Sequence, residues 1–398
     1  MTMLDLTSHF AKFRVAAPER INLAAHSHHD WPDVTLVAQE QCWYDAARLT
    51  GEKWDLVFGE LIPRVQAGIA RHLQLPDPST IAVAPNTHEF LRRLLSCLPS
   101  DRPIRILTSD AEFHTARRQL DRLEEDGLVA VTRISAEQSE TFAERFHAAG
   151  SRGEHDLVFL SQVFFTSSAT SGHLKALVEA IPSRDTFIVI DGYHGFMARP
   201  TDLSEIAGRA FYLAGGYKYA MAGEGCCFLH CPPGYGPRPR DTGWFADFGS
   251  LAAPPGKSVG YPRDAGRFLG ATFDPSGLYR LAAVFDWLAR ENITAEQIHC
   301  HAQASMALFI EGLALQHIEG LRFADLITPW GAKAQHGNFL AFRTPRAAEI
   351  EAKLAEVHVH CDHRGDRLRF GFGICTNAAD LDQALARIRR VIGINASR

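Results

Sequence analysis

A series of short apolar runs, separated by stretches with helical spacing, constrains the fold of this 398-residue chain more than any other sequence feature. Most of the runs are apolar throughout rather than alternating, which is typical of strands covered on both faces. Between several of them, apolar residues recur at three- and four-residue steps and indicate amphipathic helices. The runs are residues 80–84, 104–109, 128–134, 156–162, 186–191, 210–215 and 225–231. This pattern predicts an α/β fold with a doubly wound, mostly parallel seven-stranded sheet.

The strand and helix alternation ends near Cys231. A Pro/Gly-rich stretch follows at 232–240, and a long helical pattern then runs from about Leu278 to Leu313. The tail returns to mixed elements, with apolar runs at 338–344, 357–361 and 367–373 and an amphipathic helix after Asn377. The predicted units are an N-terminal segment over 1–50 that packs with the small domain, a large domain over 51–275 and a smaller C-terminal α/β domain over 276–398.

Charge and composition exclude several classes of partner. The chain has 41 Lys+Arg against 46 Asp+Glu, a formal net charge of −5, and so lacks the basic balance of nucleic-acid or anionic-membrane binders. No apolar run approaches the ~20 residues of a membrane span. The N-terminus has no basic head followed by an apolar stretch, so we expect no signal peptide and a cytoplasmic protein.

The eight cysteines are scattered, and free buried thiols are the expected state. Cys226, Cys227 and Cys231, together with His230, lack the paired spacing of a structural zinc site. Cys226 and Cys227 are better explained as apolar strand residues.

Polar and aromatic residues that could take part in catalysis or ligand binding follow several predicted strands. Asp191 ends one run, and Lys218 follows the next run, 27 residues later. Ligands of an open parallel sheet bind beyond the carboxyl ends of its strands, so we expect these side chains to meet in one crevice. Asn86, Thr87, Phe113, Ser161 and His194 lie at similar positions.

Pyridoxal phosphate needs this combination of groups. A lysine forms a Schiff base with its aldehyde, and a carboxylate keeps the pyridine nitrogen protonated. A helix N-terminus with small hydroxyls suits the phosphate, and an aromatic side chain can stack on the ring. Each residue also has a plainer explanation: Lys218 as a solvated lysine, Asp191 as a turn residue, Thr87 as a helix cap and Phe113 as core. Their convergence favours the cofactor site.

Several segments resemble the kynureninase family, which belongs to the fold type I pyridoxal-phosphate enzymes related to class V aminotransferases. The most specific is AGGYKYAMAGEG at 214–225, which resembles the lysine segment of that family. The other matching segments, in family order, are EFHTA (112–116), LSQVFFTS (160–167), DGYHGF (191–196), GWF (243–245) and RLRFGFG (367–373). The N-terminal segment AHSHHDW (25–31) departs from the family pattern.

The resemblance implies roles for individual residues. Lys218 would bind the cofactor and shuttle the α-proton, Tyr217 would act as a proton donor or relay, and Asp191 would pair with the pyridine nitrogen. The other implied cofactor contacts are Asn86, Thr87, Phe113, Ser161, His194, Tyr217, Trp244 and Thr272. Arg369 would clamp the substrate carboxylate, as a planar two-pronged donor can. Apart from the resemblance, we expect the histidines of 26–29 to line the substrate entrance, and Ser27 and His28 to bind the substrate.

The activity implied by the resemblance is hydrolytic Cβ–Cγ cleavage of L-kynurenine or a related amino acid, giving alanine and an aromatic acid such as anthranilate. A homodimer with the active site at its interface is also implied, with Thr272 offered across that interface. The alternative is a class V-type aminotransferase or another pyridoxal-phosphate lyase or desulfurase. A desulfurase needs a reactive cysteine, for which Cys375 is the candidate.

Other classes of protein remain open. His26, His28, His29 and Asp30 could bind a metal in an amidohydrolase built on a TIM barrel, or could form a surface loop or the substrate entrance. A nucleotide-binding Rossmann protein is disfavoured because the glycine spacing does not match. A non-catalytic protein on the same fold would not need the Lys218/Asp191 pair.

Overall fold

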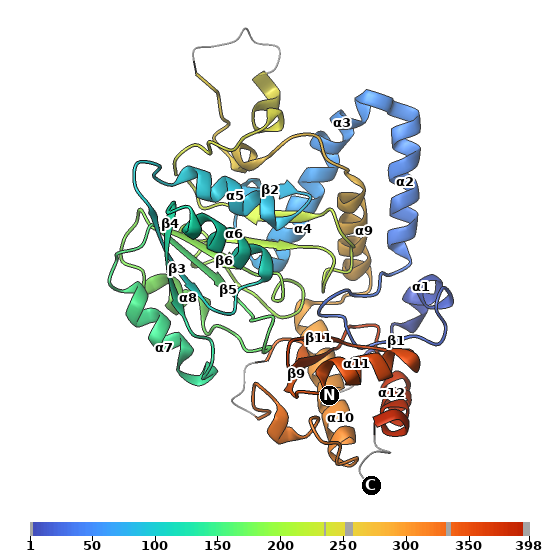
Figure 1. Ribbon diagram of the computed structural model, residues 1–398. Helices are drawn as coiled ribbons and strands as arrows, with labels where there is room; N and C mark the ends of the chain where they lie inside the picture. The colour runs from blue at the N-terminus through green and yellow to red at the C-terminus, as the bar shows by residue number, and fades with distance from the viewer. Residues whose placement is uncertain (1–2, 235, 251–257, 332–335, 393–398) are drawn as a thin grey trace.

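The computed structural model describes residues 3–234, 236–250, 258–331 and 336–392. Seven strands within these ranges form one sheet in the order β2-β8-β7-β6-β5-β3-β4 (Figure 1). They are β2 Ile81–Ala84, β3 Ile104–Ser109, β4 Val129–Ile134, β5 Leu157–Ser161, β6 Phe187–Asp191, β7 Phe211–Gly215 and β8 Cys227–His230. β8 is antiparallel to both of its neighbours, and the other pairs are parallel. The predicted mostly parallel seven-stranded sheet is confirmed.

Both faces of this sheet are buried, because successive strand residues enter different hydrophobic clusters. Val158 of β5 packs on one face, and its neighbours Leu157 and Phe159 pack on the other. The first face is covered by α4 Ile62–Leu73, α7 Ser139–Gly150, α8 Leu174–Glu179 and α9 Ser276–Arg290. The second face is covered by α5 Thr87–Cys97 and α6 His114–Glu125. Two-sided burial explains why the strand sequences are apolar throughout.

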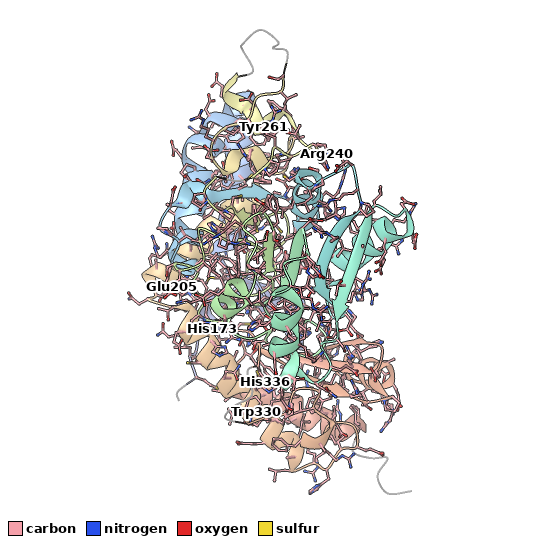
Figure 2. The ribbon with its side chains drawn as sticks, turned by 90° about the vertical axis from the view of Figure 1, so that its left-hand side faces the viewer. His173, Glu205, Arg240, Tyr261, Trp330 and His336 are labelled. Atoms are coloured by element: carbon pink, nitrogen blue, oxygen red, sulfur yellow. The ribbon has the colours of Figure 1, made fainter. Side chains whose placement is uncertain are left out.

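A smaller domain follows, as predicted. Its sheet has the order β11-β12-β9, and β10 pairs separately with β1 from the N-terminal segment. These strands are β1 Ile21–Asn22, β9 Phe339–Arg343, β10 Val359–His360, β11 Asp362–Arg364 and β12 Arg367–Gly371. The helices are α10 Ala295–Ala314, α11 Ala347–Glu356 and α12 Ala378–Ile392. In Figure 2, Trp330 and His336 lie in this lower domain, and Arg240 and Tyr261 lie at the opposite end of the molecule.

The hydrophobic clusters divide the chain differently from the predicted boundaries. Leu281 and Phe285 of α9 belong to the core of the large domain, although a boundary at 275 would assign them to the small one. Ile21 and Leu23 pack in the small domain. The rest of the N-terminal segment includes α1 Ala11–Val15 and α2 Val34–Leu49, and α2 lies along α9 beside the large domain (Figure 1), with α3 Lys53–Leu56 after it.

The predicted long helix of residues 278–313 is two helices, α9 and α10. Asn292 between them has a left-handed φ of 54°. Thr294 then starts α10 with a capping box, in which its side chain accepts from the Gln297 backbone N–H. The apolar spacing continues across the break and therefore concealed it. None of the helices in the described ranges has the length and apolar character needed to cross a bilayer.

Candidate active site

A cavity of about 250 Å³ lies at the carboxyl ends of the central strands. Asp191 is the last residue of β6, and it pairs in register with Ser161, the last residue of β5. Lys218 follows β7, and Thr87 begins α5 just after β2. Of the predicted site residues, the cavity is lined by Asn86, Thr87, Phe113, Ser161, Asp191, His194, Tyr217 and Lys218. The sheet topology thus brings these residues to one place.

Lys218 is buried in the cavity wall, with 5% of its surface exposed. Its Nζ lies 2.8 Å from His194 Nε2, and 4.7 Å and 5.4 Å from the ring centres of Tyr193 and Phe113. Burial lowers the pKa of this amine to about 7, against the opposing attraction of Asp191. Because the neutral amine is the nucleophilic form, Lys218 can attack a carbonyl near neutral pH.

Asp191 is partly buried at the end of β6. Burial raises its pKa, and its Oδ1 accepts a hydrogen bond of 2.9 Å from the Tyr193 backbone N–H. A carboxylate removed from water needs a cationic or N–H partner to remain charged. A protonated pyridine nitrogen is a partner of this kind.

The N-terminus of α5 forms another part of the cavity. Asn86 caps the helix, with its Oδ1 accepting from the Glu89 backbone N–H at 3.0 Å, and Thr87 is the first helical residue. Backbone N–H groups and the helix dipole make such a terminus favourable for an anion. Asn86 and Thr87 could therefore hold a phosphate through the helix end, although the Asn86 side-chain oxygen is already occupied.

Sequence reasoning missed several residues of the site. Tyr193 and Phe165 line the cavity, and Glu112 lies against Ser161 without lining it. The sequence signal for them is adjacency to predicted site residues: Tyr193 lies between Asp191 and His194, and Glu112 precedes Phe113. Pro85, His88, Thr115, Val163, Glu224, Gly225 and Cys227 also line the cavity.

Trp244 and Thr272 do not line the cavity. Trp244 is 42% exposed, and its Nε1 donates to Thr272 Oγ1 at 3.2 Å. The two residues lie on the irregular segment between β8 and α9, where the ring of Trp244 packs on Phe245 at 4.3 Å. Within one chain they contact each other and not the residues around Lys218.

Arg369 is buried behind the cavity rather than in its lining. Its Nε donates to Asp362 Oδ1 at 2.8 Å, its Nη2 donates to Asp362 Oδ2 at 2.5 Å, and its Nη1 donates to the Phe165 carbonyl at 2.5 Å. Asp362 faces Arg369 directly across the β11–β12 ladder. Phe165 itself lines the cavity. Arg369 therefore contacts the outer side of the cavity wall and is separated from the cavity by Phe165.

The N-terminal histidines His26 and His28 lie in different environments, one buried and the other largely exposed. His26 is buried, with its Nε2 3.0 Å from Asp362 Oδ1, and burial lowers its pKa to about 4. His28 is largely exposed, stacks on Tyr217 at 5.3 Å and lies 3.2 Å from Ser27 Oγ. Among the described residues no three His, Cys, Asp or Glu side chains group as metal ligands do. The open sheet is not a TIM barrel, so the barrel amidohydrolase interpretation is wrong.

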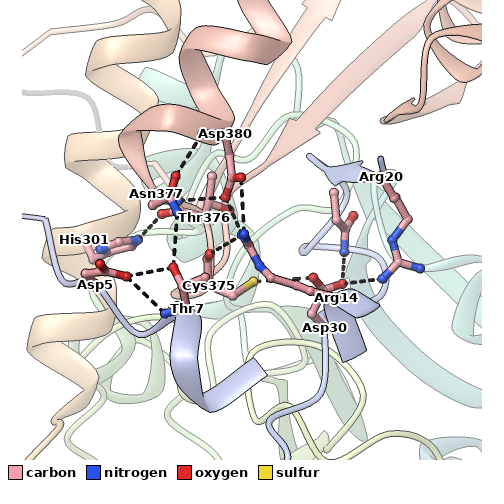
Figure 3. Close-up of polar contacts among 11 residues, drawn as sticks. Asp5, Thr7, Arg14, Arg20, Asp30, His301, Cys375, Thr376, Asn377 and Asp380 are labelled. Carbon is pink, nitrogen blue, oxygen red and sulfur yellow. Dashed lines mark hydrogen bonds and ion pairs between the residues drawn. The ribbon is translucent and has the colours of Figure 1, made fainter. Parts of the chain in front are cut away.

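Cys375 is held in a polar cluster at the junction of the N-terminal segment and the small domain (Figure 3). Its Sγ lies 3.8 Å from Asp30 Oδ2, and its carbonyl accepts from Arg14, which also pairs with Asp380. Asp30 in turn pairs with Arg20. Burial raises the pKa of the Cys375 thiol well above its usual value. Cys375 does not line the cavity beside Lys218.

No protein-family model matches the chain. One curated relative is the isopenicillin N epimerase of Streptomyces clavuligerus, which is 30% identical over 196 residues. The match covers 47% of this chain and 48% of the epimerase, so the chain spans about half the length of this relative.

Many solved structures match this chain, and a C-S lyase and a cysteine desulfurase are two of those that match over nearly its whole length. The cystine C-S lyase C-DES, in a variant with glycine covalently linked to its PLP cofactor, matches with a TM-score of 0.80 and 18% identity over 97% of this chain and 99% of C-DES. The apo cysteine desulfurase of Thermococcus onnurineus NA1 matches with a TM-score of 0.77 and 13% identity, covering 98% of each chain. The chain therefore has the α/β fold that this C-S lyase and this cysteine desulfurase share.

Proposed function

We propose that this chain binds pyridoxal 5'-phosphate and acts as a lyase on a small α-amino acid, removing a substituent from Cβ. The observation that carries the proposal is the presence of the buried Lys218 amine and the partly buried Asp191 carboxylate in one cavity. The structural match to C-DES, which has a PLP cofactor and is a C-S lyase, supports both the cofactor and the reaction class.

The donor set of the cavity fits this cofactor. Lys218 supplies the amine for its aldehyde, Asp191 supplies the carboxylate for its pyridine nitrogen, and Phe113 supplies an aromatic face. The N-terminus of α5 supplies a site for its phosphate. When bound, pyridoxal phosphate acts as an electron sink for the electrons released at the substrate Cα.

Lys218 then moves the protons of the reaction. With pyridoxal phosphate and substrate bound, the Lys218 Nζ would serve as the base beside the substrate Cα, since burial already lowers its pKa to about 7 in this cavity. It takes the proton from Cα and delivers it to the leaving group. His194, whose pKa burial lowers well below its usual value, is neutral and fixes the position of the amine through its Nε2.

Arg369 is the proposed partner of the substrate α-carboxylate. Asp362 and the Phe165 carbonyl together accept three of its hydrogen bonds. A guanidinium has N–H groups beyond these, on Nη1 and Nη2, so donors remain for a substrate. Asp362 fixes the plane of the guanidinium. Because Arg369 lies behind Phe165 of the cavity wall, a substrate carboxylate would have to reach these donors past Phe165.

The reaction of the apo-protein with the cofactor should depend on pH. Burial lowers the pKa of Lys218 from 10.5 to about 7, and only its neutral form attacks the aldehyde. We expect the association rate with pyridoxal phosphate to rise through pH 7 and to level off well below the range of an ordinary lysine. Stopped-flow absorbance across pH 5.5–10 measures this profile, and a rate that still rises steeply above about pH 9 would contradict it.

The cysteines favour a lyase over a desulfurase that uses a protein thiol. All eight lie in the described residues, and Cys227 is the cysteine that lines the cavity. Burial raises the pKa of Cys227 to about 12, and its Sγ lies 3.5 Å from Tyr193 Oη. A thiol in this state is a weak nucleophile.

A Cys375→Ala variant tests the desulfurase alternative. Because Cys375 is bonded to Asp30 away from the cavity, we expect turnover to change by less than about threefold, with a loss of stability of about 1 kcal/mol from the shortened core side chain. Turnover of cysteine or cystine and thermal unfolding are measured on the same preparation. A loss of activity in a variant that remains folded would favour the desulfurase.

Product analysis tests the reaction class. A lyase should release pyruvate and ammonia from cystine, cysteine or another β-substituted alanine, with no keto acid added. Dependence on an added keto acid would instead show an aminotransferase. Loss of optical activity without bond cleavage would show an epimerase.

Hydrolysis of kynurenine-like amino acids is a second candidate. It is favoured by the resemblance of residues 191–196 and 214–225 and by the aromatic walls of the cavity, which include Phe113, Phe165 and Tyr193. The same incubations separate the two reactions, because hydrolysis releases alanine and an aryl acid from kynurenine or 3-hydroxykynurenine.

A further inference from the structure

Glu112 is a buried carboxylate directly behind the cavity wall. It is 3% exposed and accepts hydrogen bonds from Ser109 Oγ and Ser161 Oγ, each at 2.6 Å. The Ser161 backbone N–H also donates to it at 3.1 Å. The proposed mechanism gives this carboxylate no role, yet every contact joins it to strand ends that form the site.

The position of Glu112 connects three parts of the cavity. Ser109 ends β3 and Ser161 ends β5, and Ser161 pairs in register with Asp191 on β6. Glu112 also directly precedes Phe113, so the bonds to both serines fix the start of the segment that carries this ring. The Ser161 hydroxyl has one proton, and a 2.6 Å bond to Glu112 uses it. The oxygen lone pairs of Ser161 are then left as acceptors toward the cavity.

The charged group that faces Glu112 from β6 is Asp191, whose negative charge repels that of Glu112. From β3 and β5, Glu112 is faced by uncharged donors: the hydroxyls of Ser109 and Ser161 and the Ser161 backbone N–H. Burial, with a smaller contribution from Asp191, raises the pKa of Glu112 to about 7, and the serine bonds oppose the shift. Glu112 therefore loses its proton near neutral pH and adds a second negative charge beneath the cavity above that point.

We propose that Glu112 is a positioning residue for the cofactor, which holds the Ser161 hydroxyl as an acceptor toward the cavity, anchors Phe113 and stabilises positive charge on the bound ring system. This inference rests on the proposed binding of pyridoxal phosphate. It assigns a role to a residue that does not itself contact the cofactor.

A Glu112→Gln variant tests the inference on the holoprotein, without turnover. The amide keeps the size of the side chain but removes the charge and one acceptor. We expect the dissociation constant for pyridoxal phosphate to rise about 3- to 10-fold, the usual worth of a buried hydrogen bond. We also expect the pH midpoint of the absorbance change of the bound cofactor to fall by about half a unit to one unit, because removal of a nearby negative charge favours loss of a proton.

Glu124→Gln is the matched control. Glu124 lies on α6 and accepts from the Val131 backbone N–H and from Arg133, but it does not line the cavity. The Glu124→Gln variant should keep the wild-type dissociation constant for pyridoxal phosphate and the wild-type pH midpoint. Ser161→Ala is the second variant, and it should weaken cofactor binding, since it removes the hydroxyl that Glu112 holds as an acceptor toward the cavity.

Wild-type affinity and midpoint in Glu112→Gln would overturn the inference while leaving the proposed function intact. If Glu112→Gln does not fold, unchanged cofactor binding in Ser161→Ala would overturn it instead. A wild-type protein that does not bind pyridoxal phosphate would overturn the proposed function, and this inference with it.

Discussion

Replacement of Lys218 by alanine is expected to lower turnover by at least about 10³-fold, because one side chain supplies both the covalent attachment and the proton transfer. The Nζ is buried beside His194, so another lysine has no route to the same position. The variant should still bind pyridoxal phosphate, through Asp191, Phe113 and the N-terminus of α5. Its cofactor should pass through a dialysis membrane, whereas borohydride-reduced wild-type protein should retain it.

The control for this variant is Lys175→Ala. Lys175 is a surface lysine that pairs with Glu205, and its loss should leave turnover and cofactor retention unchanged. Initial rates on the best substrate of the product panel measure both variants. Turnover within tenfold of wild type in a folded Lys218→Ala protein would remove the basis of the mechanism.

Asp191→Asn is expected to lower kcat by about 10- to 100-fold, because a hydrogen bond to a charged group is worth about 1.5–3 kcal/mol. The asparagine oxygen can still accept from the Tyr193 backbone N–H, so the turn after β6 should survive. What is lost is the negative charge that keeps the ring nitrogen protonated. We therefore expect a change in the absorption spectrum of the holoprotein together with the loss of rate.

Asp202→Asn is a matched control, because Asp202 makes the same local contact. Its Oδ1 accepts from the backbone N–H of Ser204, two residues later, at an exposed site. It should behave as wild type in rate and spectrum. An Asp191→Asn protein with a wild-type spectrum would show that this carboxylate does not contact the cofactor.

The positions of the strands could be predicted because each is a continuous apolar run, and both faces of the sheet are buried. The carboxyl ends of those runs then indicated Asp191, Lys218 and Ser161, and the sheet topology brings them together. Local sequence was sufficient here because the feature that defines the site is the end of a strand.

Other features depend on contacts that no local pattern records. Asp362 binds Arg369 through the register of the β11–β12 ladder, and Glu112 binds Ser161 across 49 residues. Trp244 bonds to Thr272 and not to the cavity, although its segment had suggested a cofactor contact. Long-range pairings of this kind are set by packing, so they became visible only with the structure.

Covalent attachment of pyridoxal phosphate to Lys218 can be located by mass spectrometry. Purified protein is saturated with pyridoxal phosphate, reduced with borohydride, digested and analysed by mass spectrometry. We expect a yellow protein before reduction and a single pyridoxyl-modified peptide that carries Lys218. A colourless protein, or a modification distributed over surface lysines such as Lys175, would contradict this expectation.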